Sequence, residues 1–261
     1  MILDTLAAAA RARVAESKKE VPPKEMRRRA ETMDRGGNFP FERALAGEGI
    51  HFICEVKRAS PSKGIIAREF PYCGIAREYQ AAGASCISVL TEPTQFLGND
   101  IYLKEIRDAV TLPLLRKDFT VDEYQIDQAK VLGADAVLLI CALLDSVTLE
   151  RFLDRCGALG LSALVEAHDA AELKMALDAG ARLIGVNNRD LRDFTVDLQN
   201  SVRLRELAPP AVTFVAESGI KTPEDVALLH RAGVNAVLIG ETLMKSPNKR
   251  SALDKLRGNT G

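Results

Sequence analysis

The chain has 261 residues, 47% of them hydrophobic, and its 35 basic and 36 acidic residues leave a formal net charge of −1. This balance argues against nucleic-acid and membrane partners and favours a small-molecule ligand, while the length suits one large domain. Five scattered cysteines argue against a disulfide framework or a zinc site, and the absence of a signal peptide or a long apolar span predicts a cytoplasmic protein.

Residues 1–48 are predicted to form a helical extension that packs on the rest of the domain. Ile2–Lys19 is rich in Ala, Arg and Lys, a break follows at Pro22 and Pro23, and a second basic stretch covers Lys24–Arg35. The basic cluster in this second stretch could attract an anionic substrate or nucleic acid. A short run of charge is more often a solvated helix face, and we favour that interpretation.

Beyond the extension, one short pattern occurs four times: a helical stretch ends in Gly, two residues follow, and an apolar run begins. The glycines are Gly83, Gly133, Gly180 and Gly233. Gly adopts the left-handed conformation at a helix end without a steric penalty, so each copy predicts a helix that turns directly into a strand. The copies lie about 50 residues apart, twice the ~25 residues of one strand and one helix, which predicts a further strand between each pair.

Eight short apolar runs satisfy this expectation. They cover residues 52–57, 86–91, 113–117, 136–141, 162–166, 183–187, 212–216 and 236–240. Helical segments separate them throughout, which implies parallel strands joined by right-handed crossovers. Eight such units favour an α/β fold of the closed (β/α)8 TIM-barrel type over an open doubly wound sheet, although the count by itself allows either. We therefore expect residues 1–261 to form a single barrel domain.

Polar residues at the C-terminal ends of the strands are the candidates for function, because that end of a barrel carries the active site. In the first strand Glu55 and Lys57 share the inward face, since side chains alternate along a strand. Lys117, Glu166 and Asn187 end later strands. Any one of them alone is more often part of a structural ion pair or a surface charge. Together they predict lysines and carboxylates that shift one another's pKa values and perform acid–base chemistry without a metal.

Glycines after the last two strands predict a phosphate site. Gly219 follows the seventh strand and Gly240 follows the eighth, where backbone N–H groups could approach an anion near helix N-termini. Either glycine alone could be a simple turn residue. The loop 59–64 after the first strand is either an ordinary turn or a mobile loop that closes on a polar ligand. The three histidines are predicted to be structural or surface residues.

The segment 52–64, Phe-Ile-Cys-Glu-Val-Lys-Arg-Ala-Ser-Pro-Ser-Lys-Gly, closely resembles the signature of the indole-3-glycerol-phosphate synthase family. The strand ends at 115–119, 164–168, 185–191 and 216–220 resemble the family's later motifs in the same order. The resemblance spans essentially the whole chain. One departure is the segment 91–98, Thr-Glu-Pro-Thr-Gln-Phe-Leu-Gly, where the family more often has an aspartate-containing variant.

The resemblance implies conversion of 1-(2-carboxyphenylamino)-1-deoxyribulose 5-phosphate into indole-3-glycerol phosphate, with loss of carbon dioxide and water, in tryptophan biosynthesis. It implies no organic cofactor and no metal. Lys117 is the expected general acid and Glu166 the expected general base. The other expected catalytic residues are Glu55, Lys57, Asn187 and Ser218. The expected substrate- and phosphate-binding residues are Ser60, Phe96, Phe119, Arg189, Glu217, Gly219 and Gly240.

Other functions stay open from the sequence alone. Another phosphosugar barrel enzyme, such as a phosphoribosylanthranilate isomerase or a Schiff-base aldolase, would reuse the phosphate loops with a different catalytic set. A catalytically silent binding or scaffold protein would have no reason to retain Glu55, Lys57, Lys117 and Glu166 together. We expect a monomer whose partner is the small-molecule substrate. Whether the extension touches that substrate is left open.

Overall fold

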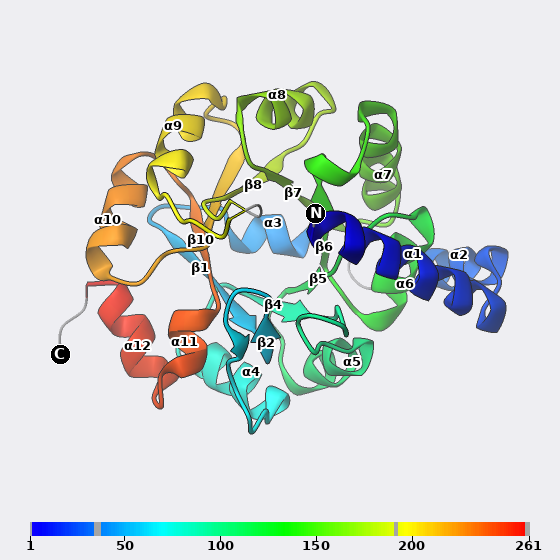
Figure 1. Cartoon of the computed structure of the whole chain (residues 1–261), viewed down its shortest axis with the longest axis horizontal. Coiled ribbons are helices and arrows are strands. Elements are labelled where there is room, and N and C mark those ends of the chain that lie inside the picture. The colour runs from blue at the N-terminus through cyan, green and yellow to red at the C-terminus, as the bar shows by residue number, and fades with distance from the viewer. Residues whose placement is uncertain (1, 34–37, 191–192, 259–261) are drawn as a thin grey trace.

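The computed structural model describes residues 2–33, 38–190 and 193–258. Eight parallel strands close into a barrel in the order β1-β10-β9-β8-β7-β6-β5-β4 (Figure 1). They are β1 (His51–Val56), β4 (Cys86–Leu90), β5 (Leu114–Lys117), β6 (Ala136–Ile140), β7 (Ser162–Ala167), β8 (Leu183–Asn187), β9 (Thr213–Glu217) and β10 (Ala236–Ile239). All eight predicted strands are present, with ends that differ from the prediction by at most one residue. The (β/α)8 TIM barrel is confirmed, because β1 pairs with both β4 and β10 and leaves no open edge.

Helices follow the strands and form an outer layer around the barrel (Figure 1). They are α4 (Tyr72–Ala81), α5 (Asp100–Ala109), α6 (Glu123–Leu132), α7 (Ser146–Ala158), α8 (Ala170–Asp178), α9 (Gln199–Leu207), α10 (Pro223–Arg231) and α12 (Lys249–Leu256). Two shorter helices, η1 (Cys141–Leu143) and α11 (Glu241–Lys245), follow β6 and β10 directly. Across the described residues, no helix combines the length and the apolar character needed to cross a membrane.

Short-range signals define both ends of these helices. Asp122, Asp145 and Asp169 each accept a hydrogen bond from a backbone N–H in the first turn of α6, α7 and α8, which satisfies a donor that the helix itself leaves unpaired. At the other ends, the predicted left-handed glycines are confirmed. Their φ angles lie between 81° and 95° at Gly83, Gly133, Gly180 and Gly233. The four helices α4, α6, α8 and α10 therefore each end just before a glycine, and the chain then enters the next strand.

The core has two layers, one on each side of the barrel wall. Outward side chains such as Phe214 pack against the helices, and inward side chains such as Ile53 and Leu164 fill the barrel. Because side chains alternate along a strand, the next inward residues after Ile53 and Leu164 are Glu55 and Glu166. The packed interior therefore ends in a layer of charged side chains at the C-terminal end of the barrel, which we call the mouth.

The extension runs from the mouth to the opposite end of the barrel. α1 (Ile2–Glu20) begins at the mouth, and α2 (Pro23–Thr32) lies beside α6 (Figure 1). α3 (Pro40–Ala44) covers the far end, where Phe41 and Leu45 are fully buried among inward side chains of the strands. The extension thus contributes both to the floor of the barrel and to the surroundings of the mouth.

Helix bounds in the extension follow the predicted break. Pro23 occupies the first position of α2, where its missing N–H costs nothing. The second helix is shorter than the predicted Lys24–Arg35, because Met33 is already extended; residues 34–37 lie outside the described part of the chain. Arg27 and Arg28 are more than half exposed and pair with glutamates of the same helix, so this basic stretch is a solvated face.

Candidate active site

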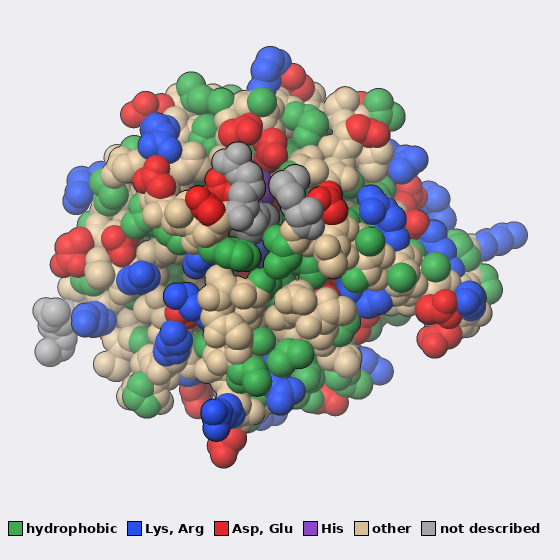
Figure 2. All heavy atoms as spheres, viewed as in Figure 1, with side chains coloured by type: hydrophobic (Ala, Val, Ile, Leu, Met, Phe, Trp, Pro, Cys, Tyr) green, Lys and Arg blue, Asp and Glu red, His purple; other side chains and the backbone are tan. Residues whose placement is uncertain are grey.

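A cavity of about 540 Å³ opens at the mouth. It is lined by all thirteen site residues that the sequence predicted: Glu55, Lys57, Ser60, Phe96, Lys117, Phe119, Glu166, Asn187, Arg189, Glu217, Ser218, Gly219 and Gly240. In the space-filling view of this face, Lys and Arg side chains gather over α11 on one side of the mouth, while hydrophobic side chains lie near its centre (Figure 2). A cavity of this size that combines apolar walls with a few convergent charges is typical of a small-molecule site.

The acid–base cluster, defined here as Lys117, Glu166 and Glu217, lies at the bottom of the cavity. The Nζ of Lys117 lies 3.2 Å from an oxygen of Glu166 and 3.2 Å from an oxygen of Glu217. The Nδ2 of Asn187 donates to the other oxygen of Glu166 at 3.4 Å. Both glutamates are almost completely buried. One lysine therefore serves two buried carboxylates.

Burial and mutual charge shift the pKa values of this cluster in different directions. Burial would lower the pKa of Lys117, but the carboxylates of Glu217, Glu166 and Glu55 outweigh it and raise the pKa, so the lysine is protonated. Burial would raise the pKa of Glu166, but Lys117 and His168 hold it below its usual range. Burial raises the pKa of Glu217 to about 7, with repulsion from Glu166 adding to the effect of burial. Glu217 is therefore the carboxylate that exchanges a proton near neutrality.

The position of Glu217 corrects the sequence prediction. The predicted strand 212–216 leaves Glu217 in the phosphate loop, whereas β9 extends to Glu217 and pairs it with Asn187 of β8. Its side chain consequently points into the barrel. Gly185 makes room for it, because a Cβ on Gly185 would overlap Oε1 of Glu217. The sequence signal for Gly185 is a glycine inside an apolar strand, which marks a close approach of another group.

Glu55 and Lys57 form a second pair on the neighbouring side of the cavity. Their Oε1 and Nζ atoms are 2.7 Å apart, and the hydroxyl of Ser88 donates to the other oxygen of Glu55 at 3.4 Å. Gly240 packs against this pair, since a Cβ there would overlap Glu55 and reach within 2.9 Å of the Lys57 Nζ. With a φ of −113°, Gly240 is not in the left-handed region. Glycine is needed at this position for space.

The side of the cavity opposite the aromatic residues suits an anion. Ser218 and Gly219 adopt consecutive left-handed conformations, with φ of 67° and 83°, and the amide of Asn188 donates to the Ser218 carbonyl. Lys63 and Lys245 also line this part of the cavity. The loop 59–64 is a short hairpin formed by β2 (Ala59–Ser60) and β3 (Gly64–Ile65). Backbone N–H groups and lysines together can hold a phosphate.

The aromatic end of the cavity is formed by Phe96 and Phe119, whose ring centroids are 6.3 Å apart at an interplanar angle of 44°. Ile2, Leu3 and Leu6 of α1 line the cavity as well. A planar aromatic ligand would find apolar contacts on several sides here. The extension therefore contributes directly to the cavity wall.

Two further side chains near the mouth make contacts within the protein. Arg189 uses its guanidinium to donate to the carbonyl of Phe194, which secures its own loop. His168 lies between two carboxylates, with Nε2 3.3 Å from Glu166 and Nδ1 3.0 Å from Glu172. Burial would lower the pKa of His168, but these glutamates raise it to about 10. The sequence assigned His168 a structural or surface role and did not predict its contact with Glu166, although the two residues are close in the chain.

The sequence matches the family model "Indole-3-glycerol phosphate synthase" over residues 3–256. The chain belongs to this family. An indole-3-glycerol phosphate synthase of Ruminiclostridium cellulolyticum is 54% identical, with 99% of each chain covered. One of Endomicrobium trichonymphae is 52% identical, with 98% of this chain and 100% of the relative covered. The 3-hexulose-6-phosphate synthase of Salmonella typhimurium has a TM-score of 0.66 at 13% identity, covering 80% of this chain and 97% of that one, which shows the fold alone.

The segment 91–98 of this member of the indole-3-glycerol phosphate synthase family folds around the side chain of Glu92. That carboxylate accepts hydrogen bonds from the backbone N–H groups of Thr94, Gln95 and Phe96. Gly98 returns so close to the strand that a Cβ would overlap the carbonyl of Leu90. The Glu92 side chain therefore sets the backbone that carries Phe96.

Proposed function

We propose that this member of the indole-3-glycerol phosphate synthase family is a carboxy-lyase. It closes the ring of 1-(2-carboxyphenylamino)-1-deoxyribulose 5-phosphate to give indole-3-glycerol phosphate, carbon dioxide and water. The observation that carries the proposal is the position of Lys117, whose Nζ lies within 3.2 Å of both Glu166 and Glu217 at the bottom of the cavity. Ring closure and dehydration need proton donors and acceptors close to neighbouring substrate atoms, and this cluster of one lysine and two glutamates can supply both.

The cavity favours one orientation of this substrate. The phosphate would occupy the side with Ser218, Gly219 and the lysines, and the anthranilate ring would pack against the cavity wall formed by Phe96 and Phe119. The ketone of the sugar then lies between these ends, near Lys117. Holding the ring carbon and the ketone carbon together converts ring closure into a step with little entropic cost.

Ring closure requires a proton at the ketone oxygen. The ring carbon that bears the carboxylate attacks the ketone carbon, a C–C bond forms, and Lys117 donates a proton to the oxygen, which becomes a hydroxyl. The bond to the carboxylate then breaks, and carbon dioxide leaves while its electron pair restores the aromatic ring. Lys117 is well suited as the donor because it is charged, buried and aimed into the cavity.

Dehydration requires a second donor and a base. The hydroxyl leaves as water after it takes up another proton, and the adjacent CH2 group loses a proton to complete the indole double bond. Glu217, whose pKa is raised to about 7, is a suitable second donor. Glu166 is the base: its pKa is held down by the charge of Lys117, so it rises once Lys117 has given up its proton.

The charge state of Lys117 also bears on the aldolase alternative. Schiff-base formation needs a neutral amine as the nucleophile, and catalytic lysines of that kind have lowered pKa values. Here the surrounding carboxylates raise the pKa of Lys117. This direction supports a proton donor and does not favour a Schiff-base nucleophile.

Turnover of the proposed substrate tests this function. The chain contains no tryptophan, so the indole fluorescence of the product rises from a low protein background. In the presence of a chelator, wild type should form product, and Lys117→Ala and Glu166→Ala should each lose roughly 100- to 10,000-fold in kcat. Lys174→Ala, which changes a lysine 74% exposed on α8, is the control and should retain full activity. Folded wild type that forms no product would contradict the proposal.

A further inference from the structure

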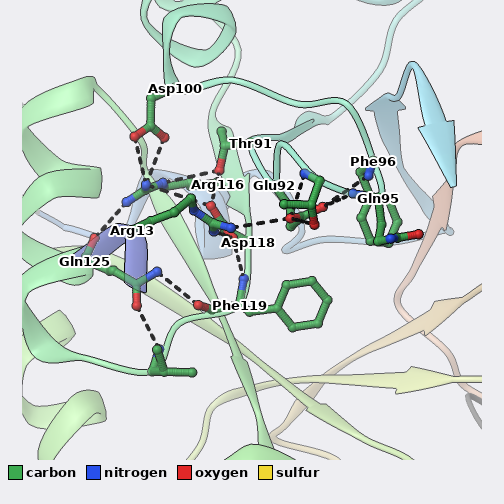
Figure 3. A network of polar contacts seen from close by, with 12 residues as sticks. Arg13, Thr91, Glu92, Gln95, Phe96, Asp100, Arg116, Asp118, Phe119 and Gln125 are labelled. Atoms are coloured by element: carbon green, nitrogen blue, oxygen red, sulfur yellow. Dashed lines mark hydrogen bonds and ion pairs between the residues drawn. The ribbon is translucent and has the colours of Figure 1, made fainter. Parts of the chain in front are cut away.

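A single arginine of the extension bridges two buried carboxylates behind the aromatic end of the cavity. The Nη2 of Arg13 lies 2.6 Å from Asp118, and its Nη1 lies 3.3 Å from Glu92 (Figure 3). Glu92 is fully buried and Asp118 nearly so, whereas Arg13 is 29% exposed. The three residues come from α1, the β4–α5 loop and the β5–α6 loop, where Asp118 directly follows β5. Arg13 is thus the point where the extension meets both loops.

Each carboxylate holds the backbone of one aromatic residue. Glu92 accepts the N–H of Phe96 at 3.1 Å, along with two neighbouring backbone N–H groups. Asp118 accepts the N–H of Phe119 at 2.8 Å through Oδ1, the same oxygen that contacts Arg13. Its other oxygen accepts the hydroxyl proton of Thr91 (Figure 3). A shift in either carboxylate would therefore move the backbone of one ring relative to the other.

We propose that Arg13 is a positioning residue for the aromatic half of the substrate. It sets the separation of Phe96 and Phe119 by fixing Glu92 and Asp118 with one rigid guanidinium. The planar fork of arginine can serve two carboxylates at once, whereas a lysine is a single point charge. The ligand class is a planar benzoate-like ring. This inference rests on the proposed function and identifies a specificity device outside its acid–base cluster.

The extension has other attachments that do not involve the aromatic residues. Lys18, also on α1, lies 2.6 Å from Asp122, the N-cap of α6. The hydroxyl of Tyr124 donates to the carbonyls of Ser17 and Val21 at 3.0 Å. Loss of the Arg13 bridge therefore leaves α1 docked. Lys18→Met is the matched control. It removes an ion pair between α1 and the start of α6, but Lys18 contacts neither Glu92 nor Asp118.

The test compares Arg13→Met, Arg13→Lys and Lys18→Met in the full chain. Isothermal calorimetry measures the Kd of a substrate analogue whose ketone is reduced to an alcohol, and separately the Kd of inorganic phosphate; steady-state assays give KM and kcat. Arg13→Met should weaken analogue binding and raise KM by about tenfold, with phosphate affinity unchanged and kcat within about threefold of wild type. Arg13→Lys should be intermediate, and Lys18→Met should lower only the melting temperature.

Two results would overturn the inference. One is an Arg13→Met protein that melts earlier but keeps wild-type affinity for the analogue, and the other is equal weakening of analogue and phosphate. If Arg13→Met does not fold, the same criteria apply to Arg13→Lys, which keeps the charge. Failure of the proposed function can be distinguished from failure of this inference, because in the first case wild type itself would neither bind the analogue nor turn over the substrate.

Discussion

Two glutamates on the rim of the barrel show how differently one residue type is used. Glu217 is the last residue of β9, Glu92 lies two residues beyond the end of β4, and both are almost completely buried. Glu92 is surrounded by donors: three backbone N–H groups, the Thr94 hydroxyl and Arg13. Glu217 shares Lys117 with a second carboxylate, and its Oε1 has no hydrogen-bond partner among the described residues.

The pKa values follow from these surroundings. Burial alone would raise the pKa of either carboxyl. The donors around Glu92 outweigh burial and lower its pKa, whereas burial and the charge of Glu166 raise the pKa of Glu217 to about 7. A fully satisfied buried carboxylate stabilises a loop, and an incompletely satisfied one retains a proton that it can release. Solvent exposure does not distinguish structural from reactive carboxylates here; the number of donors does.

Replacement of the reactive carboxylate should have the largest effect. Glu217→Gln keeps the shape of the side chain but removes its exchangeable proton, so kcat should fall roughly 100- to 10,000-fold. The free energy of unfolding at pH 8 should be unchanged or higher, because an incompletely satisfied buried charge has been removed. Indole-fluorescence kinetics and urea unfolding measure the two effects. A variant with normal kcat and a large loss of stability would make Glu217 a structural residue like Glu92.

Replacement of Glu92, the structural carboxylate, should lower stability more than it lowers kcat. Glu92→Gln leaves Arg13 with one partner fewer and turns an acceptor for several N–H groups partly into a donor. We expect the free energy of unfolding to fall by about 1–3 kcal/mol. The kcat should remain within about threefold of wild type, since Glu92 does not belong to the acid–base cluster. A pronounced drop in kcat at normal stability would contradict the distinction between a structural Glu92 and a reactive Glu217.

A smaller effect is expected from a change that only displaces Glu217. In Gly185→Ala the added methyl group would overlap Oε1 of Glu217, and the carboxylate must move away from Lys117. The kcat should fall by about tenfold, because the donor is displaced but not removed. Gly157→Ala is the control: a Cβ there meets nothing within 4 Å in α7, so it should stabilise the protein by up to about 1 kcal/mol without changing kcat. Equal kcat in both variants would show that Gly185 has no positioning role.

Local patterns were sufficient to predict the fold and the charged side chains at the strand ends, whereas the remaining site residues, such as Phe96 and Phe119, were predicted from the family resemblance. Strand alternation places Glu55 and Glu166 inside the barrel, and the helix-ending glycines mark where successive units begin. These features depend on residues within a few positions of one another, so they can be recognised in a single sequence. The pairing of β1 with β10 comes from the structure, because the number of units by itself also allows an open sheet.

The contacts that distinguish the two glutamates could not be predicted in this way. Arg13 meets Glu92 and Asp118 across 79 and 105 positions of sequence, and no periodic pattern encodes such a pairing. Glu217 was assigned to a loop because the end of its strand was placed one residue early, and a shift of one residue reverses the direction of a side chain. An error of one residue at a predicted strand end can therefore assign the wrong direction, and hence the wrong role, to a side chain in the site.

The raised pKa of Glu217 predicts how both stability and activity should change with pH. A carboxyl whose pKa is raised on folding stabilises the native state fully below its unfolded value of 4.5, and this contribution is lost as the pH rises through about 7. The same proton is the one proposed for dehydration. Activity that needs it should therefore decline over the range in which Glu217 ionises.

The pH profile of kcat, measured in wild type, Glu217→Gln and Glu92→Gln, tests the reactive role of Glu217 most directly. Wild type and Glu92→Gln should lose activity on the alkaline side with a midpoint near pH 7, and this limb should be absent from the residual activity of Glu217→Gln. The same limb in all three proteins would contradict the account.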